Sequence, residues 1–210
     1  MGTRGAYGFR INGQDKVTYN HWDSYPSCLG VSVADFVKRN KSKLKELAEG
    51  LVMVKENSKP KAKDIQYVKE FQDKTGIKLI DLNVSNQSVE DWYCLVRGAQ
   101  GNFEAMEKGF KYLTDSADFL IDSLFCEWAY IINLDTGKLE IYKGFNDSPK
   151  DNSGRYAKLF NAEQHKRTKE YGGKCYYGVV LVKEIPFKNI KGTNKLMCEL
   201  EEEIYEDENE

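Results

Sequence analysis

The first hydrophobic and polar pattern in the chain predicts an antiparallel hairpin. Residues 3–11 are rich in aromatic and small side chains, and residues 16–22 form a second extended segment. Between them lies Asn12-Gly13, the dipeptide that most readily adopts a type I′ turn. A two-residue turn places Arg10 opposite Asp15, and this charge pair supports the predicted register.

A second hairpin is predicted in the C-terminal half. Residues 126–134 are apolar and aromatic, residues 139–143 alternate between hydrophobic and polar side chains, and Asp135-Thr136-Gly137-Lys138 supplies the turn. A further strand is predicted at residues 176–185. Pro186 should end it, because proline cannot donate a backbone hydrogen bond to a sheet.

Between the two hairpins, hydrophobic residues recur every three or four positions, which is typical of amphipathic helices. Ser32 and residues 88–91 are predicted helix starts, whereas Gly50 and Gly76 are predicted helix ends. Residues 77–82 fit either a strand or a buried connector. The predicted helices span residues 32–50, 63–75, 88–97 and 101–113, with a short polar helix at 161–170.

These elements predict an α+β fold, in which an antiparallel sheet built from the N-terminal and C-terminal hairpins is covered by helices inserted in the middle of the chain. At 210 residues the chain is long enough for one domain with a full core. We assign residues 1–198 to a single α+β domain with a helical insertion near residues 32–113, and residues 199–210 to an acidic tail.

The charge of the acidic tail differs in sign from that of the rest of the chain. The tail holds eight acids, so the first 198 residues carry 31 basic side chains and 25 of the 33 acids, a net charge of +6. Leu200, Ile204 and Tyr205 are too few apolar residues for a fully packed helix, which predicts a solvated tail. The alternative is that the tail folds back onto the basic surface, with Ile204 and Tyr205 as anchors.

Composition also predicts the cellular compartment. No apolar run approaches the length of a membrane span, about 18 residues, and the N-terminus lacks the pattern of a secretory signal. The five cysteines are an odd number without metal-ligand spacing, as is typical of reduced thiols in a cytosol. We therefore expect a cytoplasmic protein with no membrane association.

Chemically versatile side chains concentrate in residues 19–30 and in the strand across the hairpin. His21 is one of two histidines, and its imidazole titrates near neutrality. Arg4 is expected to lie opposite His21 and offers paired donors to a carboxylate or phosphate. The candidate ligand-binding residues all belong to this hairpin and the turn after it: Thr3, Arg4, Tyr19, His21, Asp23, Ser24 and Tyr25.

Strand alternation predicts how these side chains are distributed. Arg4, Tyr19 and His21 should project to one face together with Asp23, whereas Thr3 and Trp22 should project to the other. The alternative is a structural role, in which His21 and Asp23 hydrogen-bond the backbone of the loop and hold the turn into Pro26.

Known catalytic and cofactor motifs are missing from the sequence. Ser24, Ser27 and Cys28 are not in a Gly-x-Ser-x-Gly elbow, and His21 and His165 are too few for a typical metal site, so we expect no metal and no cofactor. Neither a Walker loop nor a Gly-x-Gly-x-x-Gly segment opens a helix, which excludes nucleotide binding by a known signature but not by other means. Scattered lysines and a modest net charge also disfavour nucleic-acid binding.

The segment Tyr19-Asn-His-Trp-Asp-Ser-Tyr-Pro26, after the opening Met1-Gly-Thr-Arg4, resembles a family of uncharacterised proteins from phages, bacteria and fungi. Members start with Met-x-Thr-Arg and continue with a Tyr-x-His-Trp-Asp-Gly-Tyr-Pro-like motif, where this chain has Ser24 in place of the frequent glycine. Residues 127–137 resemble a second block seen in some members. The resemblance implies that the family shares these residues as a common feature: Thr3, Arg4, His21, Trp22, Asp23, Tyr25 and Pro26.

Two functions follow as expectations. The first is a small intracellular accessory protein, phage-like or mobile-element-like, that binds a host protein or a small anionic ligand or metabolite and modulates a host process such as defence. The alternative is a hydrolase or transferase with its site at the N-terminal hairpin around His21. The position of His21 decides between them, since catalysis requires it to lie in a cleft within reach of a reacting group.

Overall fold

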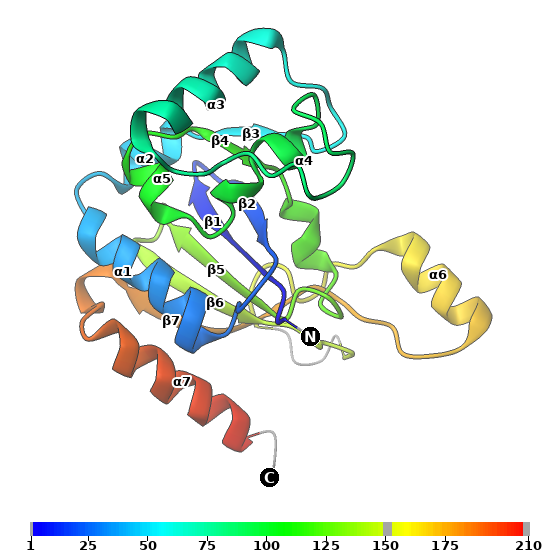
Figure 1. The fold of residues 1–210 in the computed structure, drawn as a ribbon. Coiled ribbons are helices and arrows are strands. Elements are labelled where there is room, and N and C mark those ends of the chain that lie inside the picture. Colours follow the sequence, from blue (N-terminus) through cyan, green and yellow to red (C-terminus); the bar gives the residue numbers. More distant parts are fainter. Residues whose placement is uncertain (1, 149–152, 208–210) are drawn as a thin grey trace.

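The centre of the molecule is a five-stranded sheet (Figure 1). The computed structural model describes residues 2–148 and 153–207. Pairing is antiparallel at every junction except one, so the protein has a mixed α/β fold with a mostly antiparallel sheet. In spatial order the strands are β2 (Gln14–Asn20), β1 (Gly5–Ile11), β5 (Trp128–Asn133), β6 (Lys138–Lys143) and β7 (Val180–Pro186).

Both predicted hairpins are confirmed, as β1–β2 and β5–β6. The predicted register of the first hairpin is also confirmed, because Arg10 pairs with Asp15 and their side chains form an ion pair of 2.9 Å. The predicted antiparallel sheet needs one correction, since the two hairpins meet along β1 and β5, which are parallel. The long insertion between β2 and β5 supplies the crossover that a parallel pair requires.

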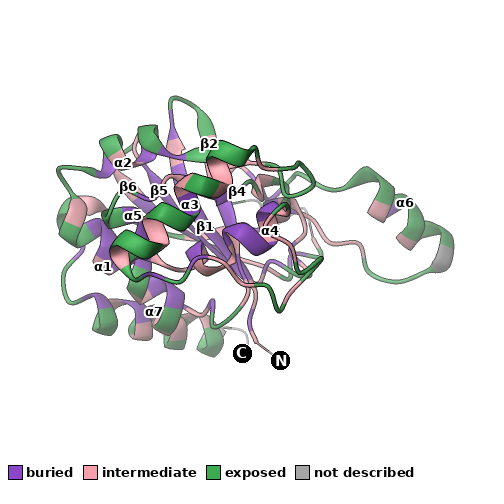
Figure 2. Cartoon of the chain, turned by 45° about the horizontal axis from the view of Figure 1, so that its top comes forward, coloured by how far each residue is buried: buried purple, intermediate pink, exposed green. Residues whose placement is uncertain are grey.

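The two faces of the sheet are covered differently, as strand alternation requires. On β1, Tyr7 and Phe9 point into the larger core, beneath α1 (Val31–Asn40). Ala6 points the other way, into a smaller core that the 3₁₀ turn Ala117–Ile121 covers. Figure 2 shows the buried residues in the strands and on the inner sides of the helices.

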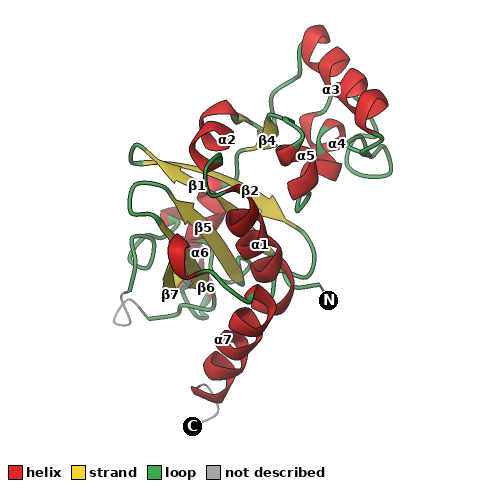
Figure 3. Ribbon diagram, turned by 90° about the vertical axis from the view of Figure 1, so that its left-hand side faces the viewer, coloured by secondary structure: helices red, strands yellow, loops and turns green. Residues whose placement is uncertain are grey.

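The insertion folds into a lobe at one end of the sheet (Figure 3). Two short strands pair in parallel within it, and aromatic side chains such as Tyr67, Phe110 and Tyr112 pack together in its core. The insertion was predicted to be helical, but it also contains a small sheet of its own. Its elements are α2 (Leu44–Gly50), β3 (Val52–Val54), α3 (Ala62–Thr75), α4 (Trp92–Leu95), α5 (Phe103–Glu107) and β4 (Tyr112–Thr114).

The predicted helices of the insertion are confirmed to different degrees. Helix α3 matches its prediction, and Gly76 ends it in the left-handed conformation with a φ of 72°. The helix predicted at 101–113 ends early, at Glu107, because Gly109 has a φ of 90° and the chain then enters β4. The helix predicted at 88–97 shrinks to α4, since Asp91 rather than Ser88 caps it by accepting from the amides of Tyr93 and Cys94.

The helix predicted at 32–50 is divided into two. A turn at residues 41–43 separates α1 from α2. Helix α1 also starts earlier than predicted, because the π-helical turn Pro26–Gly30 leads directly into it. Ser32 is therefore not an N-cap, and its hydroxyl donates to the Cys28 carbonyl at 3.1 Å.

The predicted polar helix at 161–170 is confirmed as α6 (Ala162–Tyr171), which projects from the body of the molecule (Figure 1). Asn161 caps it by accepting from two backbone amides. His165 is buried at the base of the helix, with Nε2 2.6 Å from the Tyr176 carbonyl. The strand predicted from residue 176 starts only at Val180, as the edge strand β7.

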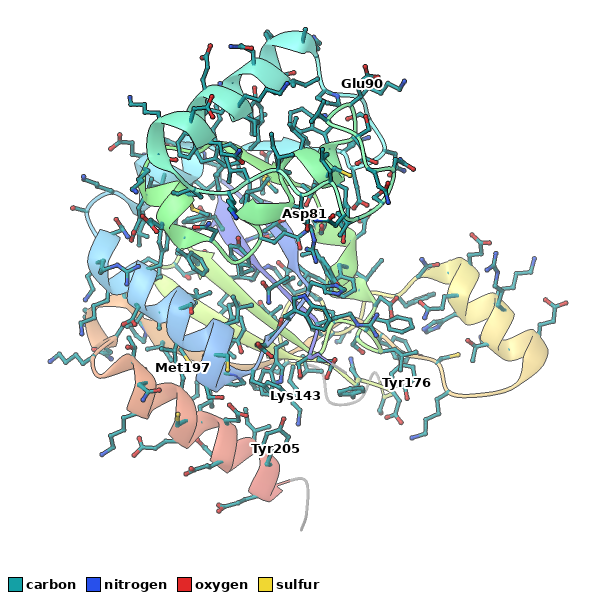
Figure 4. All side chains as sticks on the ribbon, viewed as in Figure 1. Asp81, Glu90, Lys143, Tyr176, Met197 and Tyr205 are labelled. Carbon is teal, nitrogen blue, oxygen red and sulfur yellow. The ribbon has the colours of Figure 1, made fainter. Side chains whose placement is uncertain are left out.

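The acidic tail differs most from its prediction. Residues Thr193–Asp207 form helix α7, which crosses the boundary we placed at residue 198 and lies beside α1 (Figures 1 and 4). Met197 and Leu200 are buried in the larger core, and Ile204 packs against it. The tail therefore folds back as the alternative proposed, but mainly onto the larger core, where Leu200 anchors it in addition to Ile204. Tyr205, the other proposed anchor, is 37% exposed, and the Lys143 ammonium lies 5.3 Å from the centre of its ring. Residues 208–210 lie outside the described part of the chain.

Among the described residues, none of the helices has the length and apolar character needed to cross a membrane.

Replacing Leu200 with alanine tests whether α7 is part of the core. The substitution should lower the free energy of unfolding by about 2–5 kcal/mol, because it removes a buried side chain and leaves a cavity. Urea denaturation measures the change, and Glu202→Ala on the exposed side of the same helix is the matched control, expected within about 0.5 kcal/mol of the parent. Equal stability of the two variants would contradict the packing of α7.

Candidate functional site

The site begins with a tie between the sheet and the insertion. Tyr7 projects from β1, and its hydroxyl donates to the Ala99 carbonyl at 3.2 Å and accepts from the Gly101 amide at 3.0 Å. Burial raises the pKa of this phenol, so it stays protonated and keeps its role as a donor. These bonds hold the turn at residues 97–101 against the helical face of the sheet and thereby place Arg97.

A second contact brings the predicted connector at 77–82 against the same turn. The Gly98 amide donates to the Leu79 carbonyl at 2.7 Å, and the Asp81 amide donates to the Cys94 carbonyl at 2.9 Å. Any larger residue at Gly98 would clash, because a Cβ there would lie 2.1 Å from the Lys78 carbonyl oxygen. The segment is a connector rather than a strand, with Ile77 and Leu79 buried, and it carries Lys78 and Asp81 to the site (Asp81 is labelled in Figure 4).

The third part of the site is the end of the first hairpin. Strand β2 ends at Asn20, whose side-chain amide donates to the Trp22 carbonyl and to the Ser24 hydroxyl. Ser24 is fully buried, its amide donates to the Thr3 carbonyl, and its own carbonyl accepts from the Tyr130 phenol at 2.9 Å. Asn20 and Ser24 thus fix the turn, and His21 and Trp22 are presented at its surface.

These three segments enclose a cleft of about 770 Å³. Arg97 and Lys78 bring two permanent positive charges to it and Asp81 brings one negative charge, while His21 lines the side nearest the hairpin. One Asp81 oxygen already accepts from the backbone and side chain of Asn83. Amide side chains complete the polar lining, namely those of Asn20, Gln72, Asn83 and Gln100.

His21 is held by one nitrogen only. The Tyr19 hydroxyl lies 2.7 Å from Nδ1, and the Trp22 ring packs edge-on against the imidazole at 4.2 Å between centroids. Within the described part of the chain, Nε2 has no hydrogen-bond partner. Partial burial, followed by the positive charges of Arg97 and Arg4, lowers the pKa of His21 below its usual 6.5.

A second, aromatic pocket of about 450 Å³ lies on the other side of Tyr19. Arg4 enters it with its guanidinium 4.7 Å from the centre of the Phe125 ring, and Phe119 packs edge-on against Tyr19 at 5.1 Å. Tyr93 and Glu56 line the same pocket. It therefore combines aromatic surfaces with one cation and one carboxylate.

The predicted site residues are separated by the structure into exposed and buried groups. Arg4, Tyr19 and His21 line the two pockets. Thr3 and Ser24, by contrast, are buried in the hairpin and have no surface to offer a ligand.

The remaining two predicted residues shape the backbone. Asp23 is exposed in the left-handed conformation, with a φ of 49°, and its carbonyl accepts from the Leu29 amide. The half-buried Tyr25 packs against the core, and its carbonyl accepts from the amides of Cys28 and Gly30. The structural role that we weighed for His21 and Asp23 is filled mainly by Asn20 and Ser24.

Strand alternation fails just beyond the ladder. The ladder of β1 and β2 ends at Gly5 and Asn20, so Arg4 and His21 are not paired across it. After that point His21 and Trp22 both line the cleft, although alternation predicts opposite faces. Arg4 instead pairs its backbone with Glu127 and directs its side chain into the aromatic pocket.

Arg97 and Lys78 were missed by the sequence analysis. Arg97 appears in the sequence only as the end of a predicted helix, and Lys78 is one of many lysines. Both reach the cleft through contacts between segments distant in the chain, for which the local pattern holds no signal. Only the adjacent Gly98, at the end of a predicted helix, marked this place as a turn.

Other reactive groups are kept apart. Cys94 and Cys126 are buried, and Cys28 is exposed with its sulfur 4.0 Å from the Ser27 hydroxyl. In the described ranges, no group of three or more histidine, cysteine or acidic side chains is arranged to hold a metal ion.

A scan against protein-family models found no match for the chain. Searches of curated proteins and of solved structures returned no significant match either. The family resemblance of the N-terminal motif therefore stays a prediction.

Replacing Arg97 with glutamine tests the electrostatics of the cleft. The imidazole of His21 should titrate below 6.5 in the parent protein, and the substitution should raise its pKa, because a nearby positive charge is removed. NMR titration of the imidazole protons measures both values. Arg39→Gln, on the exposed side of α1, is the control and should leave the titration unchanged; a His21 pKa that does not respond to Arg97→Gln would contradict the arrangement.

Proposed function

We propose that this protein binds a small anionic ligand in the cleft formed by the end of the first hairpin and the turn at residues 97–101. The observation that carries the proposal is the convergence of Arg97 and Lys78 on a cleft that is also lined by His21, whose Nε2 has no hydrogen-bond partner among the described residues. A volume of about 770 Å³ lies within the range of small-molecule sites, about 300–1,000 Å³. The only carboxylate among the described lining residues belongs to Asp81.

The chemistry of Arg97, Lys78 and His21 suits an oxyanion. The arginine guanidinium binds phosphate or carboxylate oxygens through paired donors, whereas lysine contributes a compact charge. His21 adds a donor when it is neutral and a further positive charge when it is protonated. Burial and then the neighbouring cations lower its pKa, so an anion that offsets these charges should raise the pKa again, and protonation and binding are therefore coupled.

The wider biological role that we propose is that of a small intracellular accessory protein, phage-like or mobile-element-like, which modulates a host process such as defence. The resemblance of the N-terminal motif supports it, and so does the presence of a binding cleft beside that motif. The five free cysteines also support a reducing, cytoplasmic location. A host protein with an acidic surface is the other partner that the charge of the cleft favours, and it would compete with a small anion.

Inorganic pyrophosphate is the probe for this proposal. Isothermal titration should show binding that weakens about tenfold or more in Arg97→Ala, as expected when a charge-assisted hydrogen bond worth about 1.5–3 kcal/mol is lost. Arg39→Ala removes an equal charge from α1 outside the cleft and should bind like the parent. Sulfate, whose charge is constant where histidine titrates, should bind more tightly as the pH falls below 6.5 and His21 gains a proton.

Equal binding by the Arg97→Ala and Arg39→Ala variants would contradict the proposal, as would the absence of any binding. The same probe, pyrophosphate, also tests the alternative, a hydrolase or transferase at His21, when the release of phosphate is measured. The unbonded Nε2 of His21, a residue that lines the cleft, favours that alternative, since a general acid or base needs such a nitrogen. Release of inorganic phosphate from pyrophosphate, lost in His21→Gln, would identify an enzyme instead of a binding protein.

A further inference from the structure

The cleft and the aromatic pocket are neighbours that share one wall. In one part of this wall, Tyr19 lines the aromatic pocket and its hydroxyl bonds His21, which lines the cleft. In another part of the wall, Tyr93 lines the aromatic pocket, and the guanidinium of Arg97, which lines the cleft, lies 5.2 Å from the centre of the Tyr93 ring. At each of these places two side chains in contact separate the hollows, and a single ligand lying across them would use both.

The two hollows differ in chemistry. The cleft presents the charges of Arg97 and Lys78, whereas the aromatic pocket presents the rings of Tyr93, Phe119 and Phe125. Phe125 has 39% of its surface exposed although it is a large apolar side chain, and the Arg4 guanidinium lies over its ring. Exposed aromatic rings and a stacked arginine are the surfaces on which planar rings bind.

Polar groups at the edge of the aromatic pocket would allow recognition of a ring by its rim. Glu56 supplies carboxylate oxygens that accept from an amino group, and Ser116 supplies a hydroxyl that both donates and accepts. A purely apolar ligand would leave these groups without partners.

We propose that the ligand of this site is a free nucleotide, with its phosphate in the cleft at Arg97 and Lys78 and its base in the aromatic pocket against Phe125. This inference rests on the proposed function, since it names the class of anion. It needs no signature loop, because side chains rather than a glycine-rich backbone provide the charges. A free nucleotide is favoured over a nucleic-acid strand because the cleft offers two permanent cations beside one carboxylate, not a basic track along several phosphates.

The matched pair of probes is adenosine 5′-monophosphate and ribose 5-phosphate, which share the phosphate and sugar and differ in the base. Isothermal titration of the full chain should show that the nucleotide binds about tenfold tighter or more, the effect expected from stacking one base on aromatic side chains. Phe125→Ala should remove most of this difference and leave the affinity for ribose 5-phosphate unchanged. Phe160→Ala, which truncates another exposed ring beside α6, is the control and should retain the difference.

Each contrary outcome has a distinct meaning. If both probes bind equally, the base has no site and the inference is overturned, although anion binding stands. If neither these probes nor pyrophosphate binds, the proposed function itself fails. A 5′-phosphorylated single-stranded hexanucleotide that binds more tightly than the mononucleotide, with a steep dependence on salt, would overturn the inference in favour of a nucleic-acid strand.

Discussion

The arrangement of the site depends on one buried phenol. Tyr7 leaves β1 toward the helical side of the sheet, and its hydroxyl bonds both the Ala99 carbonyl and the Gly101 amide. The ring also packs against Phe103 at 4.9 Å, so the insertion is attached to the sheet by polar and apolar contacts at once. The sequence around Arg97 has no local feature that would bring it to the end of the first hairpin without the contacts of Tyr7.

The cleft is therefore a product of tertiary structure rather than of a motif. The hairpin contributes His21, the connector contributes Lys78, and the turn held by Tyr7 contributes Arg97. Electrostatic coupling follows from this convergence, because partial burial, followed by the positive charges of Arg97 and Arg4, holds the pKa of His21 down. An anion in the cleft would contact both the first hairpin and the insertion, and its binding should stabilise the contact between these two parts of the protein.

The sequence predicted the features that depend on residues close together in the chain. The Asn12-Gly13 turn, helix α3 with its stop at Gly76, and the Asn161 cap of α6 are local signals, and the structure has each of them. Composition misled at the tail, because the acids of residues 199–210 describe the average of this segment and not the inner face of α7, where Leu200 is buried. Arg97 could not be recognised, since the turn that carries it is placed by contacts of Gly101 with β1 and of Gly98 with Leu79.

The most direct test of this account changes no residue of the cleft. In Tyr7→Phe the ring remains and the hydroxyl is lost, so the buried Ala99 carbonyl and the partly buried Gly101 amide lose their partner at a cost of about 1–3 kcal/mol. Tyr142→Phe, which removes a buried phenol bonded to Glu140 on the opposite face, is the matched control. We predict that Tyr7→Phe stays folded but binds pyrophosphate several-fold more weakly than Tyr142→Phe does, and equal affinity in the two variants would contradict the claim that Tyr7 positions the site.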